Sequence, residues 1–279
     1  MKRYGFAAGL TLAVVAVLGL AIPQAARPDD GDGNIFSAYA RDAHGVRVIW
    51  GEHTVVDGIP IATWALVHPR DGTILAVGAT FSQKMAEDMP DPGDGPAGAI
   101  ASLEFPALVQ ETTFFYHLEI QPQAHGHTTP PGSVNPARNS VPHFDFHFYS
   151  IPEELVWLIP AQTPPPAPPA VPASLLPAGY RPAGPSILQM GRHSAPAWSF
   201  TDPNFLSAIM IAGFLPDGSQ MHFIEPMLSQ DLLLTEQDFT LDVPMPRAFG
   251  REMLYPTQFR ALFHGNAWSL VFSDFVSVQ

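Results

Sequence analysis

Residues Pro142–Tyr149 read Pro-His-Phe-Asp-Phe-His-Phe-Tyr, so that phenylalanines alternate strictly with polar or ionisable side chains. In a β-strand, successive side chains point to opposite faces of the sheet, and this stretch therefore predicts a strand with one polar and one apolar face. The three phenylalanines are expected to pack in a hydrophobic core. The other face carries His143, Asp145, His147 and Tyr149, which can bind a metal ion or exchange a proton. An edge strand with one hydrated face would show the same alternation.

Strand geometry limits how this polar face could hold an ion. Same-face neighbours lie about 6.6 Å apart, and residues four positions apart lie about 13 Å apart. His143 and His147 could therefore share one ion only if a bulge or a strong twist shortened the strand, whereas Asp145 with either histidine is easier. Further ligands must come from elsewhere in the chain. The loop 121–141 offers His127, although histidines in an exposed loop are more often simply hydrated.

A second candidate ligand is Glu225, which follows an apolar stretch and precedes Pro226. Pro226 is expected to end the strand, so that Glu225 lies either at the rim of the fold or in a buried site. Period two places His222 on the face opposite Glu225. The two side chains are therefore not expected in the same site.

The amino-terminal residues 1–26 have the pattern of a signal peptide. Lys2 and Arg3 precede an apolar run from Phe6 to Ile22, and small residues follow it. An uncleaved membrane anchor is the alternative, because the run is close to the shortest length that spans a bilayer. The chain has no cysteine, which excludes disulfides, lipid attachment through cysteine and thiolate zinc sites. We expect a secreted or periplasmic bacterial protein that has no membrane contact once the signal is cleaved.

Composition narrows the functional classes further. Without Lys2 and Arg3, the chain has 11 basic residues against 26 acidic ones, a balance of −15, and nucleic acid is not an expected partner. The chain also contains no nucleophile elbow, no phosphate-binding loop, no dinucleotide fingerprint and no His-Glu-x-x-His motif. A small-molecule ligand cannot be named from the sequence, and a homo-oligomer is compatible with it.

The rest of the chain predicts a mostly β fold. After a flexible acidic leader at 27–34, residues 35–279 are expected to form a single antiparallel domain, either a β-barrel-like fold or a β-sandwich, with long proline-rich loops. Asp71-Gly72 predicts a hairpin turn, and ten prolines predict an extended loop over 160–185. Strands or helices are expected as follows: strands at 47–50, 61–68 and 74–81, a short helix capped by Ser82 at 82–89, two strands or a helix and a strand at 102–110 and 112–120, a helical turn at 152–154, and strands at 205–214, 220–225, 232–241, 257–263 and 267–278.

Several further motifs occur in a fixed order around the central stretch. They are Asp71-Gly72-Thr73 through Phe81-Ser82, His125-Gly126-His127 with Pro130, Met190-Gly191 with His193, Gly213-Phe214, and Phe223-Ile224-Glu225-Pro226-Met227. With them the chain resembles a family of secreted bacterial proteins of unknown function. The family carries the same Pro-His-Phe-Asp-Phe-His-Phe-Tyr signature, followed by Met-Gly-x-His and Glu-Pro-Met. The resemblance implies a secreted, mostly β domain, but no reaction.

The resemblance also implies a set of polar positions, which are His127, His143, Asp145, His147, His193 and Glu225. Family members usually carry an aspartate three residues after the histidine of Met-Gly-x-His. Pro196 stands there in this chain, and His193 is therefore expected to be less constrained.

We expect one divalent metal ion held by His143, His147, His193 and Glu225, with His127 and Asp145 nearby. Nitrogen and oxygen donors without sulfur admit zinc, manganese, iron, nickel or copper, and zinc is the first candidate in a protein of the bacterial envelope. The protein would bind this metal or use it in an enzyme reaction on an unknown substrate. The alternative is a non-catalytic structural or assembly protein of the cell envelope, in which the His/Asp strand forms a polar hydrogen-bonded network.

Overall fold

The computed structural model describes residues 46–92, 98–127, 141–161, 171–201, 207–246, 248–249 and 252–279. The predicted signal peptide and acidic leader lie outside these ranges. None of the helices in the described ranges has the length and apolar character needed to cross a bilayer.

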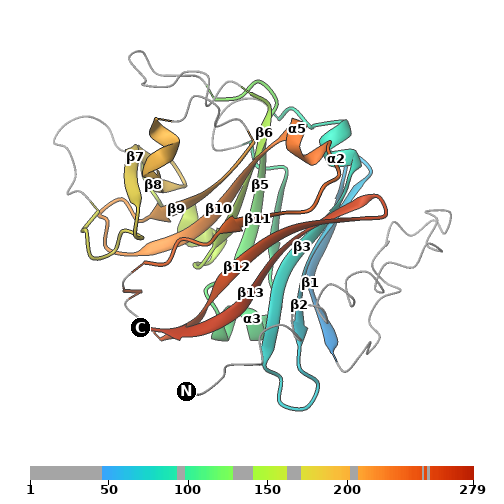
Figure 1. Ribbon diagram of the computed structural model, residues 1–279, viewed down its shortest axis with the longest axis horizontal. Coiled ribbons are helices and arrows are strands. Elements are labelled where there is room, and N and C mark those ends of the chain that lie inside the picture. The colour runs from blue at the N-terminus through green and yellow to red at the C-terminus, as the bar shows by residue number, and fades with distance from the viewer. Residues whose placement is uncertain are drawn as a thin grey trace, which may run out of the picture.

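The protein is a β-sandwich of two antiparallel sheets (Figure 1). The six-stranded sheet has the order β1-β2-β3-β13-β12-β11, and the seven-stranded sheet has the order β4-β5-β6-β10-β9-β8-β7. The mostly β prediction is confirmed, and of the two predicted architectures the structure has the sandwich. The strands are β1 (Arg47–Val56), β2 (Ile59–Val67), β3 (Ile74–Ser82), β4 (Ala101–Glu104), β5 (His117–Gln123), β6 (His143–Tyr149), β7 (Tyr180–Ile187), β8 (Gly191–Pro196), β9 (Ala208–Phe214), β10 (Met221–Ser229), β11 (Phe239–Asp242), β12 (Met253–His264) and β13 (Ala267–Val278).

The helices are short and lie between strands. They are α2 (Lys84–Glu87), α3 (Ala107–Thr112), α4 (Glu153–Val156), the 3-10 helix η3 (Ala197–Phe200) and α5 (Gln230–Leu233). The predicted helix after β3 and the predicted helical turn at 152–154 are therefore present as α2 and α4. The residue that caps α2 is Gln83 rather than Ser82, although the Ser82 hydroxyl accepts a hydrogen bond from the Lys84 amide.

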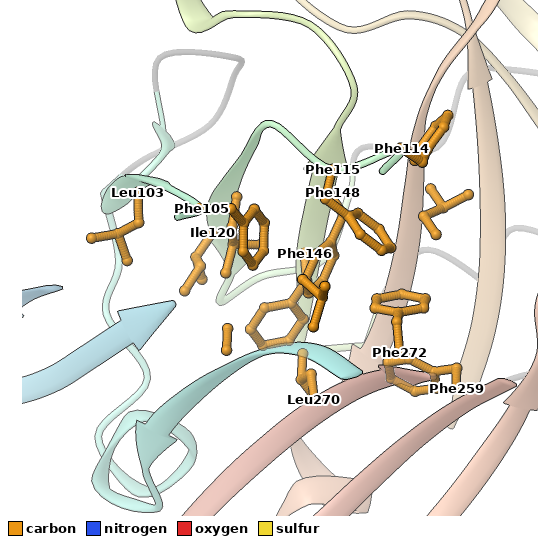
Figure 2. Close-up of a cluster of buried hydrophobic side chains, with 14 of the residues drawn as sticks. Leu103, Phe105, Phe114, Phe115, Ile120, Phe146, Phe148, Phe259, Leu270 and Phe272 are labelled. Atoms are coloured by element: carbon orange, nitrogen blue, oxygen red, sulfur yellow. The ribbon is translucent and has the colours of Figure 1, made fainter. Parts of the chain in front are cut away.

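The phenylalanine face of β6 forms the centre of the core between the two sheets. Phe144, Phe146 and Phe148 are fully buried. Phe146 stacks on Phe81 of β3, with ring centroids 5.3 Å apart. Phe148 meets Phe272 of β13 edge-on, with ring centroids 4.9 Å apart (Figure 2). One face of a single strand thus joins both sheets.

Two turns that the sequence predicts are present. Gly72 has a left-handed φ of +73°, and the Asp71 carboxylate accepts a hydrogen bond from the Thr73 amide, which closes the hairpin between β2 and β3. Asp217 similarly accepts from the Ser219 amide in the turn between β9 and β10.

Several predicted boundaries are wrong, and proline accounts for three of the four described here. Pro106 separates strand β4 from helix α3, so the expected element at 102–110 is two elements. The predicted loop 160–185 ends before β7, an edge strand that tolerates Pro182 because its outer amide positions need no partner. Pro226 does not end β10, which continues to Ser229 between two neighbouring strands. The expected strand at 232–241 is the end of α5 followed by β11.

We predict that Phe146→Ala lowers the free energy of unfolding by about 3–5 kcal/mol, because it leaves a cavity where the two sheets meet. Urea unfolding followed by fluorescence measures this value. Val276→Ala on β13, where the side chain is 42 % exposed, is the control and should cost less than about 1 kcal/mol. Equal losses in the two variants would contradict the assignment of Phe146 to the central core.

Candidate metal centre

The polar face of β6 points away from the other sheet but is not hydrated. His143, Asp145 and His147 are each almost completely buried. A second, smaller apolar cluster covers this outer face of the seven-stranded sheet, and it includes Val156 of α4 and Met190. The alternative of an edge strand with a hydrated face is therefore wrong, since β6 is an inner strand buried on both faces.

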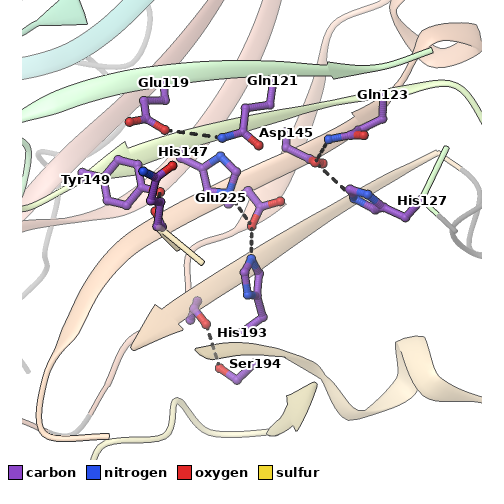
Figure 3. Close-up of polar contacts among 12 residues, drawn as sticks. Glu119, Gln121, Gln123, His127, Asp145, His147, Tyr149, His193, Ser194 and Glu225 are labelled. Atoms are coloured by element: carbon purple, nitrogen blue, oxygen red, sulfur yellow. Dashed lines mark hydrogen bonds and ion pairs between the residues drawn. The ribbon is translucent and has the colours of Figure 1, made fainter. Parts of the chain in front are cut away.

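Three strands bring one group of ligands together. The Nε2 atoms of His147 on β6 and His193 on β8 each lie 3.5 Å from the same carboxylate oxygen, Oε2 of Glu225 on β10 (Figure 3). The side chains of His147, His193 and Glu225 are only 1 %, 14 % and 4 % exposed. Their three ligand atoms lie within 4.8 Å of one another, close enough for one metal ion. We call these three residues the closed cluster.

A second group lies further along β6. His143 Nε2 is 3.3 Å from Asp145 Oδ1, and His127 Nε2 is 3.2 Å from Asp145 Oδ2. Their ligand atoms also lie within 4.8 Å of one another. His127 is 39 % exposed, and this set, His127, His143 and Asp145, is the open cluster.

All six candidate ligands lie on this face, but they form two groups rather than one. His143 and His147 fall in different clusters, as expected for side chains about 13 Å apart on an extended strand. Asp145 lies with His143, and Glu225 lies with His147. Glu225 is thus a buried ligand candidate and not a rim residue.

Gly213 explains how His193 contacts β10 although β9 lies between them. His193 pairs with Gly213 on β9, and Gly213 pairs with Phe223 on β10. A Cβ atom at Gly213 would overlap the Phe223 ring, so that only glycine lets this ring lie across β9. The Phe223 ring then packs against both His147 and His193, at centroid distances of 5.1 and 5.2 Å.

The prediction that His222 lies on the opposite face from Glu225 is wrong. The pairing of β10 with β9 slips between Met221 and Phe223, which marks a β-bulge. Two consecutive side chains can then point to the same face, and the His222 ring lies 5.9 Å from that of Tyr149 on the polar side. His222 therefore borders the closed cluster.

Four further residues of the polar face are not among the candidates predicted from the sequence. They are His117, Glu119, Gln121 and Gln123 on β5, of which Glu119 and Gln121 pair with His147 and Asp145 across the ladder. Gln123 donates a hydrogen bond to Asp145 Oδ2 at 3.3 Å. The signal was present, because residues 117–123 read His-Leu-Glu-Ile-Gln-Pro-Gln with the same period of two. Gln121 and Gln123 fall in the loop that is predicted to begin at Gln121, whereas His117 and Glu119 lie in the predicted strand at 112–120 but are not among the candidate site residues.

Burial and neighbouring charges set the ionisation of these side chains. Burial lowers the pKa of His147, and it lowers the pKa of His193 to about 3 with the help of His147. Burial would raise the pKa of Asp145, but His143 and His127 hold it well below its usual value. Burial also acts to lower the pKa of His143, yet Asp145 raises it overall. Neutral imidazoles and an ionised carboxylate are the forms that bind divalent metals.

Comparison with protein-family models, with curated proteins and with solved structures gives no match to this chain. The buried histidines and carboxylates themselves are therefore the evidence for function. Two groups of these side chains have the donors and spacing to hold a metal ion.

We predict that His222 makes the metal-free protein sensitive to acid. Burial lowers the pKa of His222 from 6.5 to about 3, so below pH 6.5 the unfolded chain binds a proton that the folded chain does not. Stability that is present above pH 6.5 is therefore lost as the pH falls. Relative to the unchanged protein, His222→Phe should gain about 2 kcal/mol of unfolding free energy between pH 6.5 and 5.

Urea unfolding at both pH values, in the presence of a chelator, measures this difference. His264→Phe replaces an exposed histidine and serves as the matched control. A pH-independent difference for His222→Phe would contradict the prediction.

Proposed function

We propose that this protein binds a divalent metal ion, with zinc as the first candidate, at the closed cluster of His147, His193 and Glu225. We further propose that it does so in the bacterial envelope or outside the cell. The observation that carries the proposal is the convergence of two imidazole nitrogens on one carboxylate oxygen in a buried site. The protein is then a secreted or periplasmic metal-binding protein.

The donor spacing supports a bound ion. In a tetrahedral site with metal–ligand bonds of about 2.1 Å, neighbouring donor atoms lie about 3.4 Å apart. Each histidine Nε2 lies 3.5 Å from Glu225 Oε2, which is close to that value. Two of the three donor distances are therefore close to those of a bound ion, and the two histidine nitrogens lie within 4.8 Å of each other.

His147 provides a second argument. It is buried, and neither of its ring nitrogens makes a hydrogen bond to the described part of the chain. A buried polar atom without a partner costs about 1–3 kcal/mol, and a metal ion bound to Nε2 would remove part of this cost. A polar network held by hydrogen bonds, the alternative interpretation of this face, would be expected to satisfy its central histidine.

The donor set also suggests the chemistry. Two histidines and one glutamate leave a fourth zinc position for water or an oxygen-containing ligand, as in catalytic rather than structural zinc sites. Zinc in such a site lowers the pKa of bound water or polarises a carbonyl or phosphoryl group. Hydrolysis is therefore the first reaction class to test.

A second candidate function is a structural or assembly role in the envelope. The observation that favours it is an exposed apolar surface formed by Leu155, Trp157, Leu158, Ile187 and Leu188. A hydrogen bond from the Gln189 amide to the Ile159 carbonyl ties the two segments of this surface together. Light scattering would favour this role if it showed a stable oligomer that persists after the metal is removed.

We predict that protein purified without an affinity tag contains a divalent metal and that Glu225→Gln and His193→Ala each lose one equivalent of it. Both changes remove a donor from the closed cluster. Elemental mass spectrometry measures the metal content, and thermal unfolding checks that the variants fold. His264→Ala, which removes an exposed histidine, should keep its metal. Unchanged metal content in both cluster variants would refute the proposed site.

We predict that expression in a bacterial host yields a periplasmic or secreted chain that lacks residues 1–26. The basic residues and the apolar run at the amino terminus have the pattern that signal peptidase recognises. Intact-mass measurement of the periplasmic fraction tests this. Recovery of a chain that still begins at Met1 in the membrane fraction would instead indicate an anchor.

A further inference from the structure

We propose that the open cluster of His127, His143 and Asp145 is a second metal site, separate from the closed cluster and in faster exchange with solvent. It takes a divalent cation with nitrogen and oxygen donors. This site goes beyond the proposed centre and does not depend on it.

The tautomer of His143 carries the argument. Its Nδ1 lies 2.7 Å from the carbonyl oxygen of Val141. A carbonyl only accepts hydrogen bonds, so Nδ1 holds the proton and the neutral ring presents a bare lone pair at Nε2. His143 Nε2 lies 3.3 Å from Asp145 Oδ1, which also accepts hydrogen bonds. Neither of these two atoms has a hydrogen-bond partner in the described part of the chain.

Two acceptors buried this close together repel each other unless a proton or a metal ion lies between them. His143 and Asp145 are each only 2 % exposed, so the low local dielectric strengthens the repulsion. A metal ion that binds both atoms would convert the repulsion into two bonds. His127 provides the third donor, with Nε2 3.2 Å from the other oxygen of Asp145.

A tight turn after β5 positions the His127 side chain beside His143 and Asp145. After β5 ends at Gln123, the Gly126 amide donates to the Gln123 carbonyl and Gly126 takes a left-handed φ of +66°. This turn places the His127 ring 4.8 Å from that of His143. The side-chain amide of Gln123 donates a hydrogen bond to Asp145 Oδ2 and so helps to orient the carboxylate.

The two clusters do not share a carboxylate within the described residues. Both oxygens of Asp145 face members of the open cluster, whereas Oε2 of Glu225 faces the two histidines of the closed cluster. The geometry therefore favours two mononuclear sites over one bridged pair.

Exposure distinguishes the two sites. His127 is 39 % exposed, whereas the most exposed ligand of the closed cluster, His193, is 14 % exposed. A chelator reaches the open cluster through His127, and metal should leave that site first. Metal release should therefore occur in a fast and a slow phase.

The test is to load the purified metal-free protein with Zn²⁺, remove the excess, and follow release to a coloured chelator. We expect two equivalents, one released quickly and one slowly. His127→Ala should lose the fast equivalent and keep the slow one, and Asp145→Asn should behave in the same way. Glu225→Gln should lose the slow equivalent and keep the fast one.

The matched control is His125→Ala. His125 is two residues from His127 in the same turn, but it is 77 % exposed and pairs with Asp91 at 3.1 Å, and its removal should leave both equivalents in place. One total equivalent that depends on both His127 and Glu225 would overturn the inference in favour of a single mixed site. Two equivalents in His127→Ala would also overturn it. One equivalent that depends on His127 and Asp145 alone would support the inference while refuting the proposed function.

Discussion

The burial of β6 on both faces is the constraint on which the rest of the structure depends. On one side its phenylalanines tie the two sheets together through Phe81 and Phe272. On the other side its histidines and aspartate are buried as well, so every polar atom there needs a partner. Other strands of the same sheet supply these partners: its neighbour β5 supplies two side-chain amides and the Glu119 carboxylate, its neighbour β10 supplies Glu225, and β8, beyond β9, supplies His193. Burial of the polar side chains thus brings the ligands of the candidate metal centre together, just as burial of the phenylalanines forms the core.

Much of the fold could be predicted because its signals are local. The alternation in β6, the Asp-Gly turns and the hairpin of β2 with β3 each depend on a few adjacent residues. Proline was less informative, since its effect depends on where a strand lies in the sheet. Pro182 lies in an edge strand, and Pro226 lies in an inner strand that its neighbours hold in place. Local sequence does not reveal either position.

The six candidate ligands named from the sequence all lie on the polar face of the seven-stranded sheet, but their separation into two clusters could not be predicted. It depends on which strands are neighbours in the sheet and on the path of each turn. The position of His222 depends on a bulge that period two cannot show. The resemblance to a secreted family stays a prediction, as do the metal and its identity.

The bulge in β10 has a consequence for how this chain can vary. The bulge accommodates one extra residue in β10. The parts of the strand before and after the bulge therefore both keep their apolar side chains toward the core. Deletion of a single residue here would force one segment to slip, and Glu225 could then exchange faces with Ile224. Relatives with the same fold are therefore expected to tolerate substitutions at this point more readily than changes in length, so that the spacing between residue 221 and Glu225 would be a better marker of ancestry than the residues in between.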